Sequence, residues 1–339
     1  MYKRQLNDLR DRARTIAPAL RRERALLRLG ELISAVPGTA PAPVSASPAV
    51  AAWSAGAPYD RMRIERFSQL AAHLSELAPE PAPALPEFTP RRALLPFYEA
   101  YFSNYIEGTE FTLDEAARIV FDAAAPDGRP LDAHDILGTY RLVSDDKVMR
   151  HTPRTGAELV DLLKERHAIM LERRTDVLPG RVKQVPNRAG STRFVEPELA
   201  EATLAAGFDS GAGVLDPFAR AVLLMFLVSE VHPFTDGNGR MARLMMNAEL
   251  AAADEVRIII PTVFRLNYLS ALKGATHNGQ FSSLVSVLRF AQRWTARLDL
   301  STRNTAERDL EATHALVDAN EAEAAGVRLV LPPSTPPAG

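Results

Sequence analysis

The stretch DPFARAVLLMFLVSEVHPFTDGNGRMARLMMNAEL, residues 216–250, predicts two helices joined by a polar loop that contains two glycines. Asp216 followed by Pro217 is a favourable N-cap and first-turn pair. Residues 218–231 are apolar on nearly every face, which is typical of a helix at the centre of a bundle. After the loop, residues 239–253 again place apolar positions at helical spacing. This stretch therefore predicts the core of a helical domain.

A helical pattern continues on both sides of this stretch, from about residue 93 to residue 298. Thr-x-x-Glu sequences at 112–115 and 155–158 are capping boxes, which mark the starts of helices. One strand pair is predicted, 181–185 with 192–196, and it forms a hairpin. We therefore predict an all-α fold, a helical bundle that carries a small β-hairpin.

Composition divides the rest of the chain. Residues 1–35 alternate charged and apolar positions and predict an N-terminal helical region. Residues 36–92 are rich in Pro and Ala and predict a linker, with one short helix near 61–77. Residues 299–339 predict a C-terminal surface helix over 305–325 and a disordered tail.

The overall charge and the cysteine count exclude several classes of protein. The net charge is −2, whereas a general nucleic-acid binder needs clustered Lys and Arg, so we expect no nucleic-acid partner. The chain has no cysteine, which excludes disulfides and thiolate metal sites. The longest apolar run, residues 221–228, is far shorter than the roughly 20 residues needed to span a bilayer. We expect a cytoplasmic protein without a membrane partner.

The loop after residue 231 has the features of a phosphate-binding site. Gly237 and Gly239 allow the backbone to approach an anion, and the following helix offers its N-terminal amides and the positive end of its dipole. Arg240 and Arg243 are three residues apart and so share one helix face. Two arginines beside such a loop predict a polyphosphate clamp.

Two further residues suggest that this site carries out a reaction. Asp236 is a candidate ligand for the divalent cation that accompanies a polyphosphate. His232 ends the apolar helix, where a neutral imidazole could accept a proton from an attacking hydroxyl. Together with the phosphate site they predict phosphoryl or nucleotidyl transfer.

The sequence HPFTDGNGRMAR, residues 232–243, resembles the signature of the Fic family, H-P-F-x-[DE]-G-N-G-R-x-x-R. This resemblance implies transfer of AMP from ATP to a Ser, Thr or Tyr hydroxyl of a target protein, with release of pyrophosphate. It also implies roles for the residues of the loop: His232 would be the general base, and Asp236 would ligate Mg²⁺. The α- and β-phosphates would be held by Gly237, Asn238 and Gly239. Arg240 would contact the β-phosphate, and Arg243 would contact the γ-phosphate.

The resemblance extends over about residues 93–298, which would form the Fic domain. The hairpin at 180–196, with Arg193 and Phe194, resembles the family's flap, which aligns a target peptide by strand addition. Tyr268 lies in a segment that resembles the adenine side of the family's nucleotide site.

A second motif resembles a built-in inhibitor. The sequence SNYIEG, residues 103–108, ends a predicted helix over 94–108 and is similar to the Fic inhibitory motif [ST]-x-x-x-E-[GN]. Ser103 and Glu107 are one turn apart and share a face. By analogy with the family class that has an N-terminal inhibitory helix, Glu107 would pair with Arg243 and occupy the space of the γ-phosphate.

Other functions stay open at this point. Glu107 is also compatible with removal of AMP, and related proteins transfer phosphate, UMP or phosphocholine. Kinase variants of the family carry Lys where this chain has Gly239, which argues against that activity. A nucleotide-sensing adaptor without turnover belongs to another class. The target protein cannot be identified from the sequence, and a homodimer is allowed.

Two features outside the motifs receive structural interpretations. His167 lies within a predicted helix among apolar and charged neighbours and is expected to be a structural histidine. Arg173 and Arg174 are expected to be solvated surface residues.

Overall fold

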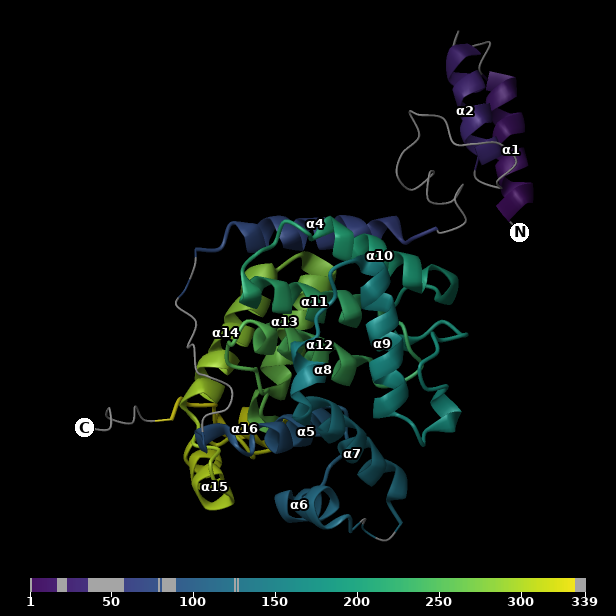
Figure 1. Cartoon of the computed structure of the whole chain (residues 1–339). Coiled ribbons are helices and arrows are strands. Elements are labelled where there is room, and N and C mark those ends of the chain that lie inside the picture. The colour runs from purple at the N-terminus through teal and green to yellow at the C-terminus, as the bar shows by residue number, and fades with distance from the viewer. Residues whose placement is uncertain are drawn as a thin grey trace.

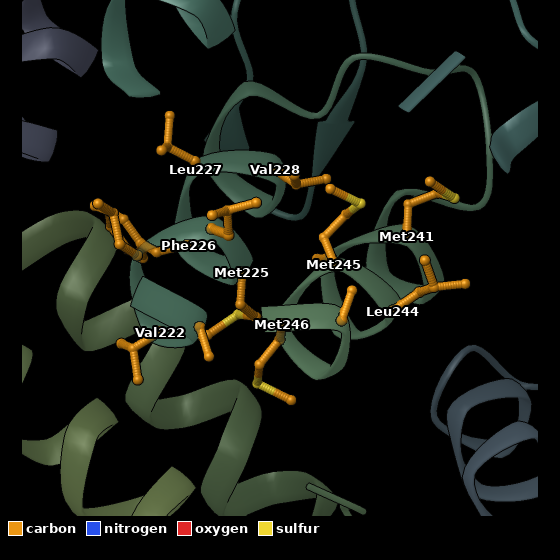
Figure 2. Packing of buried hydrophobic residues seen from close by; sticks show 14 of the residues in the cluster. Val222, Met225, Phe226, Leu227, Val228, Met241, Leu244, Met245 and Met246 are labelled. Atoms are coloured by element: carbon orange, nitrogen blue, oxygen red, sulfur yellow. The ribbon is translucent and has the colours of Figure 1, made fainter. Parts of the chain in front are cut away.

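Helices α11 (Pro217–Val231) and α12 (Asn238–Ala252) form the centre of the fold, as the sequence predicts (Figure 1). The Asp216 side chain caps α11 by accepting a hydrogen bond from the Ala219 amide at 2.9 Å. Met225 and Met245 are fully buried between the two helices (Figure 2), whereas Phe226 packs its ring against Phe67 and Phe281 of other helices. Methionine suits this place because its flexible side chain fills irregular gaps.

The structure is a computed structural model that describes residues 2–16, 23–35, 58–78, 80, 90–124, 126 and 128–332. Further helices of the body surround α11 and α12: α4 (Arg61–Ser75), α5 (Leu95–Ile106), α6 (Leu113–Asp122), α7 (Pro130–Ser144), α8 (Asp146–Arg150), α9 (Gly156–Met170), α10 (Ala200–Ser210), α13 (Arg265–Asn278), α14 (Phe281–Arg297), α15 (Arg303–Ala312) and α16 (Ala319–Ala325). The predicted all-α fold is confirmed, since the described part of the chain holds one sheet, of two short strands.

Helix α4 belongs to the core, although the sequence analysis assigned residues 36–92 to a linker. Phe67, Leu70 and Leu74 are buried on one face of the helix and pack in the same cluster as residues of α10 and α11. The spacing of three and four residues between them makes this stripe. The core therefore includes an element that precedes the predicted domain.

The prediction of one C-terminal surface helix over residues 305–325 is wrong. The chain forms two helices there, α15 and α16, and buries Leu310, Ala315 and Ala322 in a second core with Trp294. Small and apolar residues in this Glu-rich stretch lie on one side, so the helices pack against α5 and α6 residues of that cluster. The predicted disordered tail lies outside the described residues from 333 onward.

The hairpin is shorter than predicted, with β1 (Arg188–Ala189) paired antiparallel to β2 (Thr192–Arg193). Residues 181–185 do not form a strand. The Lys183 amide instead donates to the carbonyl of Pro233, at 2.9 Å, and Pro186 has no N–H to donate. The first arm of the flap is thus bonded to the loop between α11 and α12.

Helices α1 (Tyr2–Ile16) and α2 (Glu23–Ala35) confirm a helical N-terminal region and contact each other. None of the helices in the described ranges has both the length and the apolar character needed to cross a bilayer.

Candidate active site

The loop between α11 and α12 is held in one shape by its own residues. His232 has a left-handed backbone, φ 51° and ψ 59°, and ends α11. Asn238 closes the loop: its Oδ1 accepts from the Phe234 amide and its Nδ2 donates to the Phe234 carbonyl, both at 2.8 Å. The side chain of Asn238 is buried, and its amide group shapes the loop.

The geometry of His232 suits a general base. Nδ1 lies 3.3 Å from the carbonyl oxygen of Ser229, which can only accept, so this contact requires the proton on Nδ1. Nε2 is then the ring atom that can take a proton. Burial lowers the pKa of His232 to about 4, which keeps the imidazole neutral at physiological pH.

A candidate anion-binding surface lies at the N-terminus of α12, which follows the loop that begins at this histidine. Gly237 precedes the helix with φ +76°, a conformation that side chains disfavour, and its amide donates to Asp236 Oδ1 at 2.7 Å. The Gly239 amide belongs to the first helical turn, where backbone N–H groups have no partner within the helix. Arg240 and Arg243 follow on one face and are both buried.

Glu107 covers this anion-binding surface. Its Oε1 accepts from Arg243 Nη2 at 2.7 Å. A Cβ atom added to Gly239 would lie 2.2 Å from the same oxygen, so the carboxylate rests directly over the start of α12. Ser103 Oγ accepts from Arg243 Nε at 3.0 Å, and the Ser103 carbonyl from Nη2 at 2.8 Å. Residues 103–107 and the loop, distant in sequence, therefore meet at Arg243.

Asp135 and Arg174 also belong to this site, although the sequence predicted no role for Asp135 and a solvated surface position for Arg174. Asp135, buried on α7, accepts from Arg240 at 2.7 Å and from Arg174 at 2.9 Å through the same oxygen, Oδ2. The side chain of Arg174 is only 17% exposed and also bonds to Asp176, so it is not a solvated surface residue. Asp135 is 105 residues before Arg240, and no motif near it signals the contact.

Replacing Asp135 by Asn is expected to destabilise the protein by about 3 kcal/mol, because the buried Arg240 and the half-buried Arg174 lose the nearest carboxylate that they share. Asp176→Asn is the matched control: Asp176 contacts the same Arg174 from an exposed position, and such pairs contribute less than about 1 kcal/mol. Urea unfolding of the three proteins measures both effects. Equal losses for the two variants would show that Asp135 does not anchor Arg240.

The position of Asp236 fits a metal ion whose other ligands are mainly the phosphate oxygens of a bound nucleotide and water. Its side chain is 44% exposed, and Oδ2 lies 3.4 Å from Arg240 and 3.7 Å from Arg174. Within the described ranges no three His, Cys, Asp or Glu side chains form a metal cluster. Mg²⁺ commonly uses one or two carboxylates with phosphate oxygens and waters, and this single carboxylate beside the anion surface meets that requirement.

His167 has a structural position, as expected. The Gly180 amide donates to its Nδ1 at 2.9 Å, so Nε2 carries the proton and donates to the Asp236 carbonyl at 3.0 Å. The ring also stacks on Phe234, with centroids 3.8 Å apart. His167 thus joins the start of the flap to the loop, and burial lowers its pKa to about 4.

Because the pKa of His167 is lowered in the folded protein, we predict that the protein loses stability in acid. The unfolded chain protonates near pH 6.5 but the folded chain only near 4, so the unfolded state binds more protons between these values and stability falls as pH falls through them. Between pH 7.0 and 4.5 the contribution is about 2.5 kcal/mol. Urea unfolding at both pH values measures the drop in the free energy of unfolding. This drop should be about 2.5 kcal/mol smaller in His167→Gln than in the wild type. Parallel losses would contradict the prediction.

The three residues predicted at the adenine side and in the flap differ in their exposure. Tyr268, predicted at the adenine side, is 1% exposed; its hydroxyl is 3.4 Å from Met225 Sδ and also interacts with Arg243. The Arg193 side chain is 77% exposed and pairs with Glu196. The third, Phe194, stacks on His232 with centroids 3.7 Å apart and an interplanar angle of 5°.

Residues 159–250 match the family model described as the Fic/DOC family. The protein adenylyltransferase Fic of Nematostella vectensis is 30% identical over 236 residues, covering 66% of this chain and 53% of that protein. The protein adenylyltransferase fic-1 of Caenorhabditis elegans is 26% identical over 184 residues, covering 52% and 36%. The chain thus spans about half, or less, of the length of these curated relatives.

Two solved structures share the fold. A Fic domain containing signaling protein from Bacteroides thetaiotaomicron has a TM-score of 0.51 at 20% identity, covering 73% of this chain and 97% of that chain. Fic-1, residues 134–508, from C. elegans has a TM-score of 0.51 at 19% identity, covering 88% and 86%.

Proposed function

The chain contains a Fic/DOC-family domain, and on this premise we propose that it is an autoinhibited protein adenylyltransferase. It would transfer AMP from ATP to a Ser, Thr or Tyr hydroxyl of a target protein. The observation that carries this proposal is the site at Arg243: a neutral histidine stands beside a helix N-terminus with two arginines, and a carboxylate covers that N-terminus.

The reaction follows from these positions. The target hydroxyl attacks the α-phosphorus of ATP, an oxygen–phosphorus bond forms, and the bond to the β-phosphate oxygen breaks. The hydroxyl proton moves to His232 Nε2, and pyrophosphate leaves. The α12 amides, Arg240 and Arg243 bind the phosphates and neutralise their charge. Mg²⁺, held by Asp236, would supply further neutralisation of the phosphate charge.

Glu107 would keep this reaction slow. Its carboxylate occupies Arg243 and the space over Gly239, both of which a γ-phosphate would need. ATP would then bind with its α-phosphate out of line for attack. Removal of AMP by the same site is the second candidate, because a carboxylate beside the phosphates could orient a water.

The proposal includes parts that lie outside the site. The partners are ATP and a target protein that the sequence does not identify. A cytoplasmic location agrees with the lack of cysteine. A homodimer stays a prediction.

The decisive experiment compares ATP labelled on the α-phosphate with ATP labelled on the γ-phosphate. The Glu107→Gly protein is incubated with Mg²⁺, either nucleotide and a cell lysate, and protein-bound label is counted after gel separation. AMP transfer predicts label from α-labelled ATP alone. Label from γ-labelled ATP would indicate phosphate transfer instead.

Absence of label from both nucleotides, with ATP binding retained in calorimetry, would reject the transferase. AMP removal would then be tested by incubating the protein with AMP-modified lysate proteins and measuring the release of AMP.

A further inference from the structure

We infer that helix α4, which precedes the matched family domain, positions the catalytic base through the flap, by a path from Arg63 through Arg193 and Phe194 to His232. This inference rests on the proposed function only for the role of His232 as base. The contacts themselves are independent of it.

The first step of the path is the ring contact. The rings of Phe194 and His232 are almost parallel, with an interplanar angle of 5° and centroids 3.7 Å apart. Stacking covers one face of the imidazole and restricts its rotation, whereas Nε2 lies in the ring plane and stays available to a hydroxyl. Phe194 is therefore a positioning residue that fixes the direction in which the base points.

The second step fixes Phe194 itself. The preceding residue, Arg193, is the last residue of β2, and its carbonyl accepts a hydrogen bond from Arg63 Nη2 at 2.7 Å. A two-residue strand pair holds little by itself, so contacts outside the hairpin must place it. His277 on α13 makes another such contact, 2.9 Å from Thr192 Oγ1.

The third step connects the same arginine to the helix that ends at the base. Nη1 of Arg63 bonds to Glu230, a buried residue of α11 two positions before His232. Thr276 Oγ1 also bonds to this carboxylate. One guanidinium thus bridges the flap and the C-terminal turn of α11, the two parts whose relative position sets the stack.

The position of Arg63 is in turn fixed by the packing of α4. The Asp60 side chain caps the helix by accepting from the Arg63 amide at 3.1 Å, and the Asp60 amide donates to Thr203 Oγ1 on α10 at 2.9 Å. Phe67, one turn further on, is fully buried against Phe226 of α11. Any displacement of α4 would therefore move the bond to Arg193.

The test combines transfer rates with NMR of the His232 side chain, all in the Glu107→Gly background. Phe194→Leu should lower the transfer rate 10- to 100-fold without changing the dissociation constant of ATP, and Phe194→Tyr should stay within threefold of the parent. Arg63→Gln should lower the rate about fivefold. Arg61→Gln is the matched control, because Arg61 lies on the same helix but is exposed and pairs only with Glu65.

The NMR readout separates this inference from the proposed activity. Removing the stacked ring exposes the imidazole, so the pKa of His232, which burial lowers, should rise in Phe194→Leu relative to the Glu107→Gly parent, and less so in Arg63→Gln. Three charged groups face His232: Lys183 of the flap, Glu107, and Asp236 of the loop. Glu107 is absent from every protein compared, and the other two are unchanged in all of them.

Three results would overturn the inference, two of them from Phe194→Leu alone. One is an unchanged His232 pKa in Phe194→Leu, and the other is a faster transfer, which would make Phe194 a lid. A double variant, Phe194→Leu with Arg63→Gln, should lose no more activity than Phe194→Leu alone, because both act along one path; additive losses would also overturn it. If no variant transfers AMP, the NMR result still decides whether the path exists.

Discussion

Glu107→Gly is expected to raise the rate of AMP transfer by about 10- to 100-fold. The change removes a charge-assisted hydrogen bond of 2.7 Å to Arg243, and such bonds contribute about 1.5–3 kcal/mol. It also clears the space over Gly239, where a Cβ would touch the Glu107 carboxylate. Both Arg243 and the first turn of α12 then become available to the terminal phosphate. The rate is measured as protein-bound label from α-labelled ATP.

Two further variants show whether charge or volume is responsible. Glu107→Gln keeps the size of the side chain but lacks the charge, so a charge-driven brake predicts an intermediate rate. Glu110→Gly, on the exposed chain three residues later, controls for added backbone freedom after α5 and should leave the rate unchanged. Equal labelling by wild type and Glu107→Gly would mean that this contact does not restrain the site.

His232→Ala, made in the Glu107→Gly protein, is expected to lower the transfer rate by about 10²–10⁴-fold, the usual contribution of a general base. The variant keeps the amides of α12 and both arginines, so the dissociation constant of ATP should change little. The rate should also follow the pKa of the base: activity needs the neutral imidazole and is lost as pH falls through about 4.

The control for this variant is His151→Ala, since His151 is 57% exposed and contacts only Glu158 among acidic groups. It should transfer AMP at the parental rate. A His232→Ala protein that retains more than a tenth of that rate would show that another group takes the proton.

The elements and the loop could be predicted from local sequence. A cap at Asp216 and an apolar run define α11, because a helix is formed by contacts between residues three and four apart. The glycines of the loop and the arginines that follow are contiguous, so their shared site was also readable. The pairing of Glu107 with Arg243 could be expected from the resemblance alone, since 136 residues separate them.

Tertiary structure alone decided the remaining contacts. Whether residues 181–185 form a strand depended on the carbonyl of Pro233, some fifty residues away, which binds the Lys183 amide. Arg174 is a half-buried partner of Asp135 only because α7 lies against α9.

The sequence by itself thus determined the central helices and the loop between them, and it predicted the phosphate site and the base. These features arise from periodicity and composition over a few turns. The tertiary structure decided that Asp135 holds Arg240, that α4 belongs to the core, and that Phe194 stacks on His232. Each of these contacts joins residues far apart in the chain, and their positions follow from how whole helices pack, which no local pattern encodes.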